Sequence, residues 1–113
     1  MGGCALVDRG IVAYNSHMLE LRQTDVFRQW FARLRDRRAQ QRIAARLVRL
    51  SAGLFGDAKG LGEGVSELRI DHGPGYRVYF VRRGDVVIVL LCGGDKASQD
   101  RDIRAAKAMA QDV

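Results

Sequence analysis

The most apolar run of the chain, DVVIVLLC at residues 85–92, constrains the fold more than any other feature. It is apolar at every position after Asp85, and a strand of this kind is normally covered on both faces. The two segments before it, VSELRID at 65–71 and YRVYFVR at 76–82, alternate apolar and polar residues. Such alternation is typical of strands with one buried face. We therefore predict a sheet with residues 85–92 in its interior.

Glycine-rich segments separate these strands. Residues 73–75, GPG, are predicted to turn the first strand pair, and residues 84–85, GD, the second. The segment FGDAKGLGEG at 55–64 contains four glycines and is expected to be a loop. The three strands then form an antiparallel meander.

Helical periodicity dominates the preceding part of the chain. Residues 18–23, MLELRQ, fit a first strand, and Thr24 can cap a helix whose apolar residues recur at three- and four-residue spacing. A second helix is expected over residues 37–50, and a C-terminal helix after Ser98. A chain of 113 residues suits one hydrophobic core. The prediction is a single α+β domain over residues 18–113: a strand, a helical hairpin, a three-stranded meander and a terminal helix.

Residues 1–17 show no sustained periodicity, and we interpret them as a leader or a misassigned start outside the domain. No apolar stretch of about 18 residues occurs, which predicts a cytoplasmic protein without a membrane span.

Cys4 and Cys92 are too few for a metal site, and no cofactor is expected. Cys92 lies inside the apolar run and should act as a small buried hydrophobe.

Positive charge is concentrated in one segment. Between Arg22 and Arg49 nine arginines face two aspartates, although the net charge of the whole chain is only +6. Four arginines share one arc of the second predicted helix and form what we call the arginine ridge: Arg38, Arg42, Arg46 and Arg49. The ridge, with Lys59 in the glycine-rich segment, predicts binding to RNA or to an acidic protein. The alternative is a solvated helix face.

A polar group is predicted on one face of the 65–82 hairpin. The apolar residues of its two strands are buried together only if paired residues have numbers that sum to an even value. This register places four polar residues side by side on the opposite face: Glu67, Arg69, Arg77 and Tyr79. They suit either a functional site or simple ion pairs on a solvated sheet face.

These residue types suit cleavage of RNA by a ribose 2′-hydroxyl, which needs a base, cations around the developing phosphorane and an acid. Glu67 suits the base, Arg69 and Arg77 suit the phosphate, and Tyr79 could stack on a nucleobase. Lys96, at the end of the apolar strand, is a candidate stabiliser or acid, although an unperturbed lysine is a poor acid at neutral pH.

Three stretches, RIAARLVRL, GVSELRIDHGPGYRVYF and LLCGGDKASQDRDI, resemble in this order the addiction-module killer proteins, the HigB-like branch of the RelE/ParE toxin superfamily. The resemblance spans residues 18–110. It implies a RelE-like fold and a toxin of a type II toxin-antitoxin pair, usually a ribosome-dependent endoribonuclease. The implied partners are the ribosome, messenger RNA and a cognate antitoxin, a small helix-turn-helix protein.

The resemblance also implies residue roles. Through the GYR motif, Arg77 would match the phosphate-contacting arginine of RelE-like toxins. Arg69 and Glu67 fall where those toxins keep basic or acid-base residues, and Lys96 falls near a basic residue at the end of the last strand.

The terminal helix departs from the family pattern. RelE-like toxins place a tyrosine or histidine after the last strand, whereas this helix opens with Ala97, Ser98 and Gln99. The general acid is therefore unassigned. A non-enzymatic ParE-type inhibitor of DNA gyrase is the second hypothesis, and a degenerate module that retains only antitoxin binding is the third.

Overall fold

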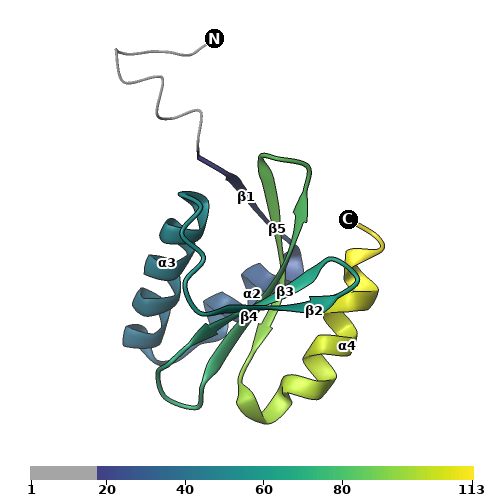
Figure 1. Ribbon diagram of the computed structural model, residues 1–113. Coiled ribbons are helices and arrows are strands. Elements are labelled where there is room, and N and C mark those ends of the chain that lie inside the picture. The colour runs from purple at the N-terminus through teal and green to yellow at the C-terminus, as the bar shows by residue number, and fades with distance from the viewer. Residues whose placement is uncertain (1–17) are drawn as a thin grey trace, which may run out of the picture.

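The computed structural model describes residues 18–113, so the interpretation of residues 1–17 as a leader lies outside the described residues. A five-stranded sheet in the order β1-β5-β4-β3-β2 forms the centre of the domain (Figure 1). The strands are β1 (Glu20–Gln23), β2 (Ala58–Gly62), β3 (Val65–Ile70), β4 (Tyr76–Arg83) and β5 (Val87–Gly94). β1 runs parallel to β5, and the other neighbours are antiparallel. The apolar strand β5 therefore lies inside the sheet, as predicted.

The helices are α2 (Asp25–Arg33), α3 (Arg37–Ser51) and α4 (Gln99–Ala110), with a 3₁₀ turn, η1 (Lys96–Ser98), before α4. Thr24 caps α2 as predicted, because its Oγ1 accepts from the Phe27 N–H at 3.0 Å. The same hydroxyl donates to the Leu91 carbonyl at 2.6 Å and so joins the start of α2 to β5. No helix within residues 18–113 is long and apolar enough to cross a membrane.

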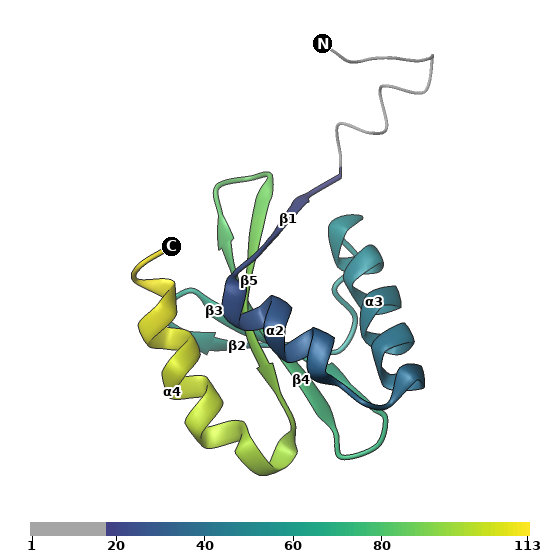
Figure 2. The same cartoon turned by 180° about the vertical axis from the view of Figure 1, so that it is seen from behind.

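Helices α2 and α3 cover one face of the sheet, and α4 covers the other (Figures 1 and 2). Phe27 of α2 and Ile43 of α3 belong to one core with the inward side chains of the central strands. Ala106 and Ala110 of α4 belong to a second core on the other face, together with Tyr79. Each sheet face is thus buried by a different part of the chain, and the sheet separates the two cores.

The predicted register of the central hairpin is confirmed. Glu67 pairs with Tyr79 and Arg69 with Arg77, so the paired numbers sum to an even value. The predicted turns at 73–75 and 84–85 also lie between strands.

The glycine-rich segment 55–64 is only partly a loop, because it contains β2. β2 pairs with β3 at the edge of the sheet, and the turn between them uses Glu63 in the left-handed region at φ 55°. An edge strand needs few buried side chains, and only Ala58 and Leu61 of β2 are partly buried. The prediction of a loop here was wrong, and the meander has four strands.

Candidate functional site

A polar cleft of about 400 Å³ opens where β3 and β4 meet their connecting turn and η1. Three of the predicted site residues line it: Arg69 from β3, Arg77 from β4 and Lys96 from η1. Two carboxylate residues, Asp57 and Asp71, line the same cleft. The structure therefore brings together cations that are up to 27 positions apart in the chain.

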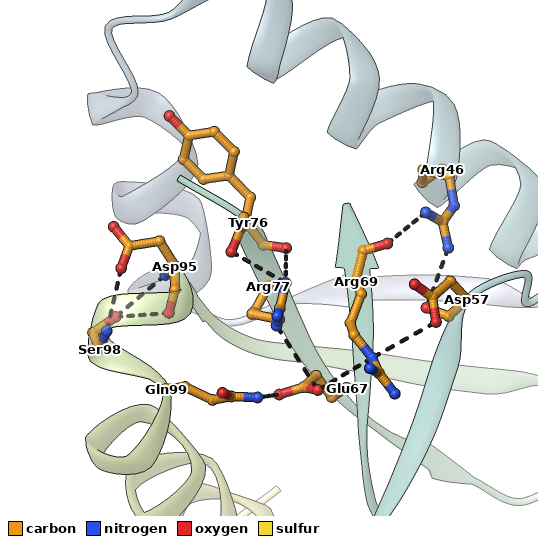
Figure 3. A network of polar contacts seen from close by, with 10 residues as sticks. Arg46, Asp57, Glu67, Arg69, Tyr76, Arg77, Asp95, Ser98 and Gln99 are labelled. Carbon is orange, nitrogen blue, oxygen red and sulfur yellow. Dashed lines mark hydrogen bonds and ion pairs between the residues drawn. The ribbon is translucent and has the colours of Figure 1, made fainter. Parts of the chain in front are cut away.

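The carboxylate of Glu67 lies close to the side chains of both Arg69 and Arg77 (Figure 3). Its Oε1 lies 3.6 Å from Nε of Arg69 and 3.9 Å from Nε of Arg77. Its Oε2 accepts a hydrogen bond of 2.7 Å from the Gln99 amide, at the first turn of α4. Both arginine Nε atoms are buried and have no hydrogen-bond partner within residues 18–113, so their attraction to Glu67 is mainly electrostatic.

Each guanidinium has a second contact that limits its orientation. Nη1 of Arg77 donates to the Gly75 carbonyl at 3.2 Å, and the Arg77 side chain is only 12% exposed. Nε of Arg69 also lies 3.6 Å from a carboxylate oxygen of Asp57. Arg77 is thus the more enclosed cation, and Arg69 is shared between two carboxylates.

The alternative of ion pairs on a solvated sheet face is right about the ion pairs of Glu67 but wrong about solvent at Glu67 and Tyr79. Glu67 is 1% exposed and Tyr79 is fully buried. Small residues of α4, Ala106 and Ala110, let the helix pack closely over this face. Tyr79 therefore cannot stack on a nucleobase, and Glu67 is too enclosed to take a proton from a substrate directly. Alternation identified the face correctly but carried no information about the helix that covers it.

The Tyr79 hydroxyl is buried, and no group in the described part of the chain forms a hydrogen bond with it. Its burial raises the pKa of the phenol well above the usual value, and the negative charge of Glu67 raises this pKa further. The phenol is therefore neutral and inaccessible at physiological pH, so Tyr79 is a core residue.

The predicted arginine ridge is exposed to solvent at three of its four positions, and Arg46 is the exception. Arg38, Arg42 and Arg49 are exposed, whereas Arg46 is partly buried. Its guanidinium donates to the carbonyls of Arg69 at 2.6 Å, of Phe55 at 3.3 Å and of Asp57 at 3.4 Å, so it joins α3 to the strands of the cleft.

Arg46 therefore serves as a structural tether rather than a free cation, which corrects its assignment as an RNA-binding residue. Lys59 is exposed on β2, directly opposite Glu67 in the strand register.

Sequence reasoning missed Gln99 and Asp57 as members of this network. Both contacts depend on how α4 and the segment before β2 pack onto the sheet, and neither position has a local motif.

A larger hollow of about 630 Å³ lies beside Trp30 and η1 but is lined by none of the predicted site residues. Polar groups there serve local structure: the Ser98 hydroxyl donates to Asp102, and Asp95 caps η1.

This fold is the fold of RelE toxins, as two solved structures demonstrate. A variant of the Escherichia coli toxin RelE in the free state is 12% identical and has a TM-score of 0.67, over 82% of this chain and 97% of that chain. The toxin-antitoxin complex RelBE2 from Mycobacterium tuberculosis has a matching chain that is 19% identical, with a TM-score of 0.55 over 70% and 99%. The predicted α+β, RelE-like architecture is thereby confirmed.

The family is defined by a sequence relative. An uncharacterized protein of Haemophilus influenzae is 46% identical over 95 residues, which are 84% of this chain and 96% of the relative. The chain belongs to the same family as this Haemophilus influenzae protein. No family model matches the chain.

Proposed function

We propose that this protein is the toxin of a type II toxin-antitoxin module and that it cleaves messenger RNA on the ribosome. The observation that carries the proposal is the cationic cleft on a RelE-type fold, with Arg69, Arg77 and Lys96 on its walls. The HigB-like subtype, inferred from three sequence stretches, is part of the same proposal.

The cleft has the properties needed to stabilise a phosphorane. Charge-stabilising groups are most effective when they are already fixed before the charge develops. Arg69 and Arg77 meet this condition because the buried carboxylate of Glu67 lies between them. Arginine can also contact two phosphate oxygens at once, and Lys96 adds a third positive charge at the rim.

The base that takes the proton of the ribose 2′-hydroxyl is assigned differently from the sequence-based hypothesis. Glu67 is enclosed, so we assign it the role of holding the arginines. Asp57 and Asp71 are exposed and line the cleft, so either carboxylate could accept a proton from a ribose hydroxyl bound there. Asp71 is the better candidate base, because Asp57 is already paired with Arg69.

The proposed partners are the ribosome, messenger RNA and a cognate antitoxin, which we expect to be a small helix-turn-helix protein. One structural neighbour comes from a toxin-antitoxin complex, which supports an antitoxin partner. The exposed ridge residues Arg38, Arg42 and Arg49, with Lys59 on β2, provide positive charge for ribosomal RNA. We expect this activity in the cytoplasm.

Inhibition of DNA gyrase without hydrolysis is the second candidate function. One observation favours it: none of the residues that line the cleft is a histidine or tyrosine, and Tyr79 is buried. A binding protein needs no proton donor, so the cleft would then bind a partner instead of cleaving a phosphodiester. A module that retains only antitoxin binding would show neither activity.

Induction of the protein in growing cells tests these functions together. Messenger 5′-ends and plasmid supercoiling are measured in one culture, with an Arg77→Ala variant as the matched control. New 5′-ends within translated regions, absent from the variant, support the endoribonuclease. Changed supercoiling with intact messengers supports gyrase inhibition, and growth arrest without either change overturns both.

A further inference from the structure

The shortest polar contact of the buried Glu67 carboxylate is made by Gln99. It is the first residue of α4, and its Nε2 donates to Oε2 of Glu67 at 2.7 Å. The two arginine contacts of Glu67, at 3.6 and 3.9 Å, both involve the other oxygen. One carboxylate oxygen thus faces α4 and the other faces the cations (Figure 3).

This division matters because a glutamate carboxylate rotates easily about its last torsion, which has a broad energy profile. A hydrogen bond to one oxygen fixes that rotation, and charge-assisted bonds of this kind are stronger than neutral ones. Without the Gln99 donor, the carboxylate could turn, and the distances from its Oε1 to Arg69 and Arg77 would change.

We propose that Gln99 is a positioning residue of the cleft: it orients Glu67, which in turn orients Arg69 and Arg77 for the phosphodiester. This inference rests on the proposed function, because the value of the orientation lies in RNA cleavage. Gln99 does not itself line the cleft.

Gln99 is not needed to hold α4 on the sheet. Ala106 and Ala110 anchor the helix in the second core, and the Asp95 carboxylate caps η1 before it. A variant that removes only the amide donor should therefore fold. Gln111, which is exposed just after the last residue of α4, offers a control substitution of the same chemistry.

The first test measures the chemical environment of the Arg69 and Arg77 side chains in the protein without RNA. Nε–Hε signals of Arg69 and Arg77 are recorded by ¹⁵N NMR and assigned by their loss in Arg69→Lys and Arg77→Lys. Gln99→Met keeps the side-chain length and removes the donor, so both signals should shift, whereas Gln111→Met should leave them in place. Unchanged signals in folded Gln99→Met overturn the proposal.

The second test measures messenger cleavage in a purified translation system at increasing ribosome concentration. Gln99→Met should lower the saturating rate about tenfold or more with little change in the half-saturating concentration, because misplacement of about 1 Å can cost about a hundredfold. Gln111→Met should cleave at the wild-type rate. Wild-type cleavage by Gln99→Met overturns the proposal.

Gln99→Glu gives a readout that a merely structural role would not change. The introduced carboxyl lies against Glu67, so the pair binds a shared proton more tightly than either group alone. While that proton is bound, the introduced group can donate as Gln99 does. Cleavage relative to wild type should therefore recover as the pH falls, and a ratio independent of pH overturns the proposal.

The two tests separate this inference from the proposed function. If the wild-type protein cuts no messenger, the proposed function fails, whereas the NMR comparison still decides whether Gln99 orients the arginines. If Gln99→Met does not fold, Gln99→Glu supplies both measurements at a pH high enough to remove the shared proton, where the introduced group can no longer donate to Glu67.

Discussion

Glu67 and Tyr79 are direct partners across the β3-β4 ladder, and α4 buries both of them. From the sequence, Glu67 was the candidate base and Tyr79 a candidate for stacking on a nucleobase. The structure separates their roles, because Glu67 contacts Gln99 and two arginines while the Tyr79 hydroxyl has no hydrogen-bond partner among residues 18–113.

Tyr79→Phe tests the assignment of Tyr79 to the core. A buried hydroxyl without a hydrogen bond costs about 1–3 kcal/mol, so its removal should keep or raise the free energy of unfolding, by about 1 kcal/mol. Toxicity should be unchanged. Urea unfolding and a growth assay measure both effects. A loss of stability would instead mean that the hydroxyl has a partner, for which Glu67, its cross-strand neighbour, is the candidate.

Cys92 predicts a stability change at alkaline pH. Burial, and secondarily the charge of Asp102, raises the pKa of its thiol from 9.0 to about 12. The folded state keeps a proton that the unfolded state releases, so this stabilisation is complete below pH 9 and is lost as the pH rises toward 12. The loss approaches about 1.4 kcal/mol per pH unit above pH 9.

Urea unfolding between pH 9 and 10 measures this slope, and comparison with Cys92→Ala isolates the thiol, because Tyr79 and Tyr76, whose free phenols titrate near 10.0, contribute equally to both proteins. Cys92→Ala should flatten the slope, although it lowers the stability at pH 8 by removing a buried side chain. Both proteins carry Cys4→Ser, so that a single thiol is compared. Equal slopes with and without Cys92 would contradict the predicted pKa.

Much of the fold follows from local patterns in the sequence. Asp85 precedes an all-apolar run that could only be an interior strand, and Thr24 precedes a helical stripe as a cap should. The alternation in β3 and β4 determined which residues pair, because a shift of one position would place Leu68 on the polar face.

The remainder depends on contacts between distant segments. The sequence AKGLG has neither alternation nor β-branched residues, so β2 forms because β3 offers it an unpaired edge. Arg46 looks like Arg42 in a helical pattern, and only the three carbonyls that converge on it make it different. Strand register in the sequence therefore placed Arg69 beside Arg77, and the end of the apolar strand placed Lys96 near them, whereas nothing local pointed to Gln99.

Gly93 should be intolerant of any side chain. A Cβ atom there would lie 2.3 Å from Cε3 of Trp30, so the indole would have to move. Gly93→Ala should lower the free energy of unfolding by about 1–3 kcal/mol, the usual cost of overpacking. Because Trp30 is the only tryptophan of the chain, its fluorescence reports the displacement.

Gly60→Ala is the matched control for Gly93→Ala. It also lies in a strand, and a Cβ atom there would meet nothing within 4 Å. Its fluorescence and melting temperature should stay close to those of the wild type. Equal effects of the two substitutions would contradict the close packing of Trp30 on Gly93.

Arg46 and Arg42 should differ although both belong to the arginine ridge. Arg46→Lys replaces a fork that reaches three carbonyls with a single ammonium that cannot reach all of them, so the free energy of unfolding should fall by about 1–3 kcal/mol. Arg42→Lys changes an exposed side chain, so its free energy of unfolding should stay within about 0.5 kcal/mol of the wild-type value.

Arg42→Glu should instead weaken ribosome association most at low salt, because phosphate contacts release counterions. Ribosome binding that is unchanged at every salt concentration would remove the ridge from the mechanism.

Arg77 is the residue on which cleavage should depend most. If it stabilises the phosphorane, Arg77→Ala should slow messenger cleavage about a hundred- to a thousandfold. Arg77→Lys should recover only part of the activity, because an ammonium group cannot make a two-pronged phosphate contact. Arg82→Ala, on an exposed residue of the same strand, is the control and should cleave normally.

Stability has to be separated from catalysis at Arg77. Its side chain is 12% exposed and lies against buried Glu67, so Arg77→Ala should also cost about 1–3 kcal/mol of unfolding free energy. Adding Glu67→Gln removes the carboxylate charge left without this arginine and should restore part of that loss, as urea unfolding will measure. The double variant should remain unable to cut messengers. If a folded Arg77→Ala protein still produces the wild-type cuts, the Glu67–Arg77 contact is a structural ion pair and the catalytic assignment is wrong.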